Sequence, residues 1–212
     1  MTEAPGAGMP RMPFRRPLVA ILRGIGPADA PGHIAALIEE GYDAIEIPLN
    51  SPDWVQSIGM AAQDHGGHAW IGGGTVLRPA EVDTLQHLGA RFIVTPNTHP
   101  PLIRHAVAAG MRVLAGFSTA SEAFAALDAG AHMLKLFPAS SFGPGHVRAL
   151  RAVLPATVPL LVVGGVTPLN LADYLAAGAD GAGIGGELYR PGQPVERTRA
   201  NALAFAQSFH IR

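Results

Sequence analysis

The 212-residue chain contains no cysteine, and only one of its fifteen basic residues is lysine. Without cysteine, the sequence excludes disulfides, thiolate metal sites and cysteine nucleophiles, and it favours a reducing compartment. Charged residues make up only 15% of the chain and the formal net charge is −1. No strong electrostatic field therefore favours nucleic acid or an acidic membrane surface.

Long apolar segments are also missing. The first sixteen residues lack the apolar stretch of a signal peptide, and no apolar run is long enough to cross a bilayer. We therefore expect a cytoplasmic protein with no nucleic-acid or membrane partner.

The sequence does contain a recurring motif, in which a glycine ends a predicted helix and an apolar predicted strand follows. It appears at Gly41, Gly89, Gly110, Gly130 and Gly178. Glycine suits the residue after a helix because it adopts the left-handed conformation without strain. The spacing predicts one strand–helix unit for each twenty-odd residues.

Eight segments are predicted to be strands, most of them continuous apolar runs, as in a parallel sheet covered on both faces. They are Leu18–Leu22, Ala44–Ile47, Trp70–Gly72, Arg91–Thr95, Arg112–Ala115, His132–Phe137, Pro159–Val163 and Gly181–Ile184. Two helix starts are marked, by a capping box in "TASE" (119–122) and by Pro168 after Thr167.

The alternation predicts an α/β fold, a single (β/α)8 barrel, with a doubly wound open sheet as the alternative. We assign residues 17–212 to the barrel as the catalytic domain and residues 1–16 to a flexible N-terminal tail. In such a barrel the functional groups lie where the strands end.

The single lysine, Lys135, lies in the apolar run "HMLKLF". Alternation places it on one side of the strand with Met133 and Phe137, which we expect to be the inner side. A lysine there can simply pack its stem and extend its ammonium to water. However, an arginine-rich chain could use arginine for that purpose, whereas only an amine can be deprotonated to act as a nucleophile. Burial supplies the neutral amine that a Schiff base needs.

Glu46 ends the second predicted strand, in "AIEIPLN". Inner side chains of alternate strands share layers in these barrels, so Glu46 can face Lys135 from across the pocket. A purely structural buried ion pair is the other interpretation, but it is a poor route to stability. A carboxylate facing an amine suits proton transfer.

Glycine clusters follow the last two predicted strands, as Gly164–Gly165 in "VGGVT" and Gly185–Gly186 in "GIGGE". Successive backbone N–H groups form anion-binding concavities, and loops after strands seven and eight often bind phosphate in this fold. His65 and His68 lie in a glycine-rich loop without nearby carboxylates at ligand spacing, so we expect no metal site.

Taken as an ordered set, these motifs resemble those of the class I aldolases that cleave 2-keto-3-deoxy-6-phosphosugar acids. The likeness runs from about Pro17 to the last helix. It is carried by "LVAILRGI", "EIPLNSP", "GGGTVL", "VTPN", "KLFPAS", "VGGVTP" and "GIGGELYR".

The resemblance implies a Schiff-base lysine at Lys135 and an acid–base glutamate at Glu46, with no metal or organic cofactor. It implies a substrate site formed by Arg23, Thr75, Lys135, Phe137, Val163, Gly164, Gly165, Gly185, Gly186 and Glu187. It also implies a homotrimer whose small-molecule partners are a phosphorylated keto acid, pyruvate and glyceraldehyde 3-phosphate.

Two residues bear on the substrate. Val163 precedes the double glycine, and Asn50 follows "PL", as in the members that act on the galactonate epimer; gluconate-type members have threonine and arginine there. The resemblance therefore implies cleavage of 2-dehydro-3-deoxy-6-phospho-D-galactonate to pyruvate and D-glyceraldehyde 3-phosphate, with the 6-phosphogluconate epimer as the alternative. We expect no pyruvate-carboxylate contact from position 50.

This chain departs from the pattern of the family that it resembles at Gly186–Glu187, where serine and aspartate are usual, so one hydroxyl is missing from the expected phosphate site. Two other classes of function stay open. A sugar-phosphate isomerase or epimerase could use Glu46 as its base without a covalent adduct. A non-catalytic phosphosugar-binding protein would bind its ligand without turnover.

Overall fold

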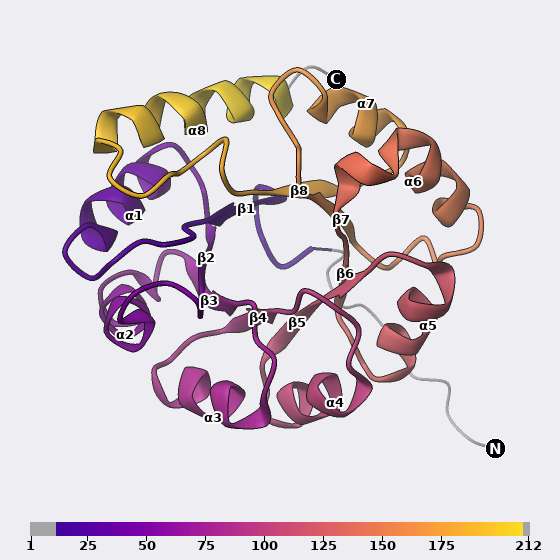
Figure 1. Cartoon of the computed structure of the whole chain (residues 1–212), viewed down its shortest axis with the longest axis horizontal. Helices are drawn as coiled ribbons and strands as arrows, with labels where there is room; N and C mark the ends of the chain where they lie inside the picture. Colours follow the sequence, from indigo (N-terminus) through magenta and orange to yellow (C-terminus); the bar gives the residue numbers. More distant parts are fainter. Residues whose placement is uncertain (1–11, 210–212) are drawn as a thin grey trace.

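Eight parallel strands close into a barrel in chain order, because β8 pairs with β1 as well as with β7 (Figure 1). The computed structural model describes residues 12–209. The strands are β1 (Leu18–Ile21), β2 (Ala44–Pro48), β3 (Trp70–Gly74), β4 (Phe92–Val94), β5 (Arg112–Phe117), β6 (Met133–Leu136), β7 (Leu160–Val163) and β8 (Gly181–Ile184). The predicted (β/α)8 barrel is confirmed, and the predicted strand ends differ by no more than one or two residues.

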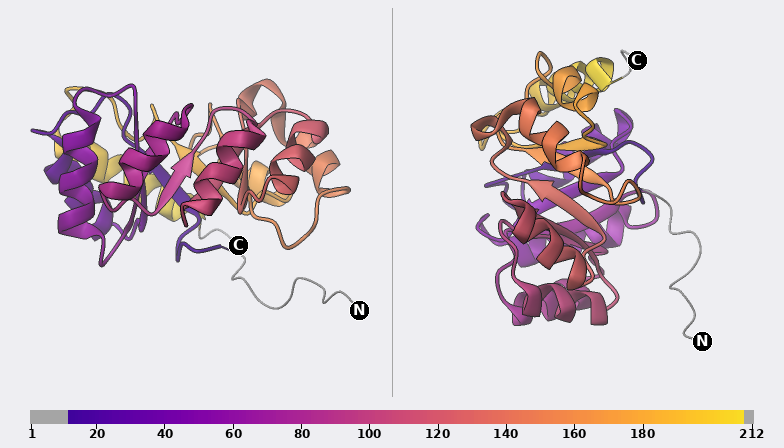
Figure 2. Two further views of the ribbon diagram at one scale, coloured as in Figure 1. Left: turned by 90° about the horizontal axis from the view of Figure 1, so that it is seen from below. Right: turned by 90° about the vertical axis from the view of Figure 1, so that its right-hand side faces the viewer.

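The helices form a ring around the strands (Figure 1), and in the side views they lie beside and in front of them (Figure 2). They are α1 (Ala30–Glu39), α2 (Trp54–His65), α3 (Pro79–His87), α4 (Pro100–Ala108), α5 (Ala120–Asp128), α6 (Gly143–Arg151), α7 (Leu171–Ala176) and α8 (Val195–Phe209), with a short 3-10 helix η1 (Ala139–Ser141) after β6. Within residues 12–209, none of them is both long and apolar enough to span a membrane.

The recurring glycines end helical segments as predicted. Gly41, Gly89, Gly110, Gly130 and Gly178 all have positive φ, between 78° and 109°. This left-handed conformation satisfies the last carbonyls of the preceding helix and turns the chain toward the next strand. The capping box at Thr119 is present too, with Glu122 accepting from the Thr119 N–H at 2.8 Å.

One predicted helix start is wrong: α7 begins at Leu171 rather than at Pro168. The Thr167 N–H donates to Asn170 Oδ1 at 2.8 Å, and the Asn170 N–H donates to Thr167 Oγ1 at 3.3 Å. Side chains that bond to nearby backbone compete with the helix, so they hold this segment as a turn.

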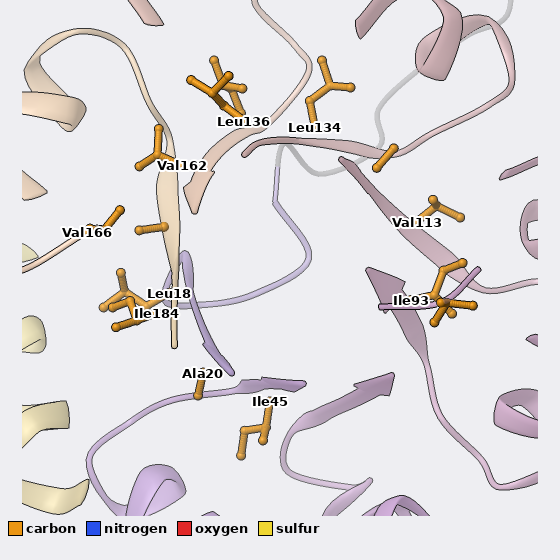
Figure 3. Packing of buried hydrophobic residues seen from close by; sticks show 14 of the residues in the cluster. Leu18, Ala20, Ile45, Ile93, Val113, Leu134, Leu136, Val162, Val166 and Ile184 are labelled. Carbon is orange, nitrogen blue, oxygen red and sulfur yellow. The ribbon is translucent and has the colours of Figure 1, made fainter. Parts of the chain in front are cut away.

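The buried apolar residues form two clusters, one outside the barrel wall and one inside it. The outer cluster lies between strands and helices; Leu134, Leu136, Ile45 and Val113, for example, point away from the barrel interior (Figure 3). The inner cluster consists of Phe14, Val19, Ala44, Phe92, Val94, Leu114, Met133 and Leu161. Because side chains alternate along a strand, a residue two positions after an inner residue also faces inward.

Part of the predicted N-terminal tail belongs to the barrel instead. Phe14 is 4% exposed, and its ring centroid lies 5.8 Å from that of Trp70 and 5.5 Å from that of Phe92. The Arg15 and Arg16 N–H groups both donate to the buried Asp43 carboxylate. These contacts close the base of the barrel, the end where the strands begin. Residues 1–11 of the predicted tail lie outside the described residues.

Candidate active site

Glu46 and Lys135 point into the barrel near its mouth, the end where the strands finish. Ala44 and Met133 belong to the inner cluster, and Glu46 and Lys135 follow each of them by two positions on β2 and β6. Both side chains are buried, with Glu46 1% and Lys135 5% exposed. The structure therefore brings the two predicted catalytic residues together inside the barrel, where each charge acts on the other.

The surroundings push both groups toward their neutral forms. Burial raises the pKa of the Glu46 carboxyl, while the charges of Lys135 and Arg23 act against this rise. Burial also lowers the pKa of the Lys135 amine; Glu46 opposes that decrease and Arg23 adds to it. Glu46 Oε2 has no hydrogen-bond partner among the residues that the structure describes. Since buried polar atoms are normally paired, such an orphan carboxyl oxygen marks a place for a ligand or a proton.

Gly74 makes room for the Glu46 carboxyl. It is paired with Pro48 in the register of β2 and β3, and a Cβ placed on it would lie 1.6 Å from Glu46 Oε1. The "GGG" run at the end of β3 thus has a specific function, which the sequence analysis missed. Three successive glycines within a strand were the available signal, because glycine in a strand often marks a close approach.

Arg23 and Thr75, two residues of the expected substrate site, meet at the mouth. Arg23 follows β1 and its Nη2 donates to Thr75 Oγ1 at 3.5 Å, while its Nη1 donates to Asn50 Oδ1 at 2.7 Å. Thr75 has φ +56°, a left-handed conformation that is uncommon outside glycine and is often found at functional sites. The sequence analysis did not foresee Asn50 as the partner of Arg23.

Phe137 and the first glycine pair lie on the opposite side of the mouth. The Lys135 ammonium lies 5.0 Å from the centroid of the Phe137 ring. Gly164 and Gly165 both have positive φ, and a Cβ on Gly164 would lie 3.2 Å from Phe137. Val163 follows the inner residue Leu161 by two positions on β7, and its Cγ2 would lie 2.9 Å from a Cβ on Gly183.

The predicted phosphate-binding loop after β8 forms contacts among its own residues. Arg190 Nε donates to the Gly186 carbonyl at 2.9 Å, and Glu187 pairs with Arg190 at 3.5 Å. The Gly185 carbonyl accepts the N–H groups of Leu188 and Tyr189. The roles of Gly185, Gly186 and Glu187 in substrate binding therefore stay predictions.

A metal centre is not formed by the side chains of residues 12–209, where no three His, Asp or Glu side chains gather as ligands would. The polar groups that converge at the mouth are instead an amine, a carboxyl and a guanidinium. This set can add to a carbonyl, move a proton and bind an anion.

Comparison with known proteins places this arrangement in a family. A family model described as KDPG and KHG aldolase matches residues 14–201. The 2-dehydro-3-deoxy-6-phosphogalactonate aldolase of Escherichia coli (strain K12) is 54% identical over 91% of this chain and 94% of its own. The 2-dehydro-3-deoxy-phosphogluconate aldolase of Pseudomonas aeruginosa is 37% identical over 66% of this chain and 64% of its own.

A solved structure described as native KDPGal superposes with a TM-score of 0.92 at 53% identity, covering 93% of this chain and 96% of that one. The family-model match extends over nearly the whole barrel, including the strands that carry Glu46 and Lys135. The resemblance drawn from the motifs is thereby confirmed. The chain belongs to the KDPG and KHG aldolase family and is an aldolase, a carbon–carbon lyase.

Proposed function

We propose that this protein is a class I aldolase that cleaves 2-dehydro-3-deoxy-6-phospho-D-galactonate to pyruvate and D-glyceraldehyde 3-phosphate. The observation that carries the proposal is the single lysine of the chain. It is buried inside the barrel near its mouth, and burial lowers the pKa of its amine. The charge of the buried Glu46 carboxyl acts on this amine, and Glu46 Oε2 has no hydrogen-bond partner among the described residues.

The reaction begins when the neutral Lys135 amine attacks the C2 ketone. Loss of water gives a protonated imine, which accepts the electron pair released later. Glu46, directly or through a water, takes the proton of the C4 hydroxyl as the C3–C4 bond breaks. Glyceraldehyde 3-phosphate leaves, and the electron pair of the broken bond forms an enamine. Protonation at C3 and addition of water then release pyruvate and restore the amine.

Substrate contacts follow from the positions around this centre. Arg23 and Thr75 are placed to bind the carboxylate of the keto acid, since a guanidinium and a hydroxyl both donate to it. Phe137 lies against the Lys135 amine and shields the imine from water. The N–H groups beyond Gly164 and Gly165 suit the phosphate, because both glycines have positive φ.

The choice of the galactonate epimer rests on Val163 and on the relatives. The relative named for the galactonate substrate matches at 54% identity over 91% of the chain, against 37% over 66% for the one named for the gluconate substrate. Cleavage rates measured on both epimers test this choice. A clear preference for 6-phosphogluconate would overturn it while leaving the aldolase chemistry intact.

The chemistry itself is tested by treating the protein with pyruvate and borohydride, followed by intact-mass measurement and peptide mapping. A reduced adduct on Lys135 is expected, and trypsin will then fail to cleave after it. Because the chain has one lysine, only Lys135 and the N-terminal amine can be trapped. Absence of an adduct at Lys135 in folded protein would favour the isomerase or the binding protein.

We further propose that the enzyme acts in the cytoplasm as a homotrimer, as the resemblance implies. Light scattering coupled to size-exclusion chromatography tests the trimer, and a monomer mass would refute it. Fractionation of the source cells tests the location.

A further inference from the structure

The Arg23 guanidinium is held by residues that follow two neighbouring strands. Its Nη1 donates to Asn50 Oδ1 at 2.7 Å, and its Nη2 donates to Thr75 Oγ1 at 3.5 Å. Asn50 follows β2 and Thr75 follows β3, so the arginine extends across the ends of the first three strands. The shorter of the two bonds is the one to the neutral amide of Asn50.

The two loops that carry Arg23 and Asn50 are joined beside this contact. The Gly24 N–H donates to Ser51 Oγ at 2.9 Å, and Ser51, which is 6% exposed, donates its own N–H to the Pro48 carbonyl. Gly24 has φ +82°, and a Cβ there would lie 2.8 Å from Pro191 Cγ. Arg23 and Asn50 are therefore arranged by bonds of the protein itself before any substrate arrives.

The guanidinium also acts on the reacting pair through its charge. It adds to the decrease that burial causes in the pKa of the Lys135 amine, and it limits the rise that burial causes in the pKa of the Glu46 carboxyl. Its own charge is left intact by the Asn50 amide, since a neutral acceptor binds a guanidinium without cancelling its charge.

We propose that Asn50 is a positioning residue of this aldolase, one that fixes Arg23 through a neutral acceptor so that the guanidinium keeps its full charge for the carboxylate of the keto acid. The inference rests on the proposed function. It requires an amide, not a carboxylate, at position 50, although either group could accept the Arg23 hydrogen bond.

The Asn50→Asp variant separates positioning from charge, because aspartate has nearly the same shape and keeps the acceptor oxygen. We expect the KM for the keto acid to rise about tenfold, since the introduced carboxylate competes with the substrate carboxylate for Arg23, while kcat changes less. The pH limb of kcat/KM that reports deprotonation of Lys135 should move to higher pH, because a carboxylate offsets the cation that lowers the amine pKa.

Asn50→Ala keeps the charge of Arg23 and removes its acceptor. We expect a smaller rise in KM and no shift of the pH limb. Gln63→Ala removes an exposed amide from α2 and is the matched control. It should leave both the KM and the pH limb of kcat/KM unchanged. If Asn50→Asp does not fold, an increased KM in Asn50→Ala supports the inference, and an unchanged KM overturns it.

The outcomes separate this inference from the proposed function. A wild-type protein that forms no borohydride adduct with pyruvate overturns both. A wild-type protein that is trapped, alongside an Asn50→Asp variant with wild-type KM and pH profile, overturns only the role of Asn50. In that case the amide would be a structural acceptor that aspartate replaces.

Discussion

Asp43 and Glu46 are two buried acids only three residues apart, but their hydrogen-bond partners differ. Asp43, just before β2 at the base of the barrel, accepts the N–H groups of Arg15 at 2.7 Å and Arg16 at 3.2 Å. Glu46, on β2 near the mouth, keeps Oε2 without a partner among the described residues. Both acids are at most 3% exposed.

The difference lies in what each end of the barrel does. Charge at the base is satisfied by two backbone N–H groups and by the Arg15 guanidinium, so it stabilises the fold. Charge at the mouth is buried without such partners, which costs stability and keeps a carboxyl and an amine ready to exchange protons. Burial alone therefore does not distinguish a structural acid from a reactive one; the partners do.

Among variants that test this contrast between mouth and base, Lys135→Met should have the largest effect. It removes the amine and fills the space with an apolar chain of similar length, so we expect turnover to fall below detection. Because the buried amine has its charged form disfavoured, the melting temperature should stay level or rise. Steady-state cleavage and thermal melts measure the two effects. Residual turnover close to wild type would remove Lys135 from the mechanism.

Glu46→Gln should lower kcat by about 10²–10⁴-fold, the usual contribution of general acid–base catalysis, while pyruvate is still trapped by borohydride. Its stability effect has a definite sign. The folded protein raises the pKa of this carboxyl above its ordinary 4.5, so the cost of the ionised form is present above the raised pKa and disappears as pH falls below 4.5.

The melting temperature of Glu46→Gln should therefore equal or exceed that of the wild type at about pH 8, and the gap should narrow in acid. Melts across the pH range check this behaviour. A variant that is less stable than the wild type in mild alkali would show that the Glu46 carboxylate is a structural partner after all.

Phe14→Ala tests the base of the barrel. Loss of a ring packed on Trp70 and Phe92 should lower the free energy of unfolding by about 3–5 kcal/mol, as for other buried aromatic residues. The mouth is untouched, so kcat and KM should match the wild type at a temperature where the variant is folded. Urea denaturation with parallel assays gives the result; unchanged stability would mean that Phe14 does not pack in solution.

Asp43→Asn should have the smallest effect. It replaces one acceptor oxygen by an NH2 group, which cannot accept. A part-buried backbone N–H of Arg15 or Arg16 then loses its acceptor, at about 1–3 kcal/mol. The effect on turnover should again be absent. A fall in kcat with unchanged stability would reverse the assignment of the two acids.

The sequence alone predicted a site residue where a chemically distinctive residue type stood at the end of a predicted strand. Lys135 and Glu46 could be found because the glycine repeat located the strands, and strand ends locate the mouth. Phe14 could not, because it stands in a proline- and arginine-rich segment with no periodicity. Gly74 and Asn50 depend on distances between residues of different strands, which no local pattern contains. The start of α7 was missed because the Thr167–Asn170 side-chain bonds override helix propensity.

The closed order of the strands also fixes where this protein can be attached to something else. Each strand runs from base to mouth and each helix returns, so the described chain both enters at Met12 and completes α8 at Phe209 on the base side. A carrier, a surface or a second enzyme joined next to Met12 or Phe209 would therefore lie on the face opposite the substrate opening. Aldolase activity and attachment can then be varied independently of one another.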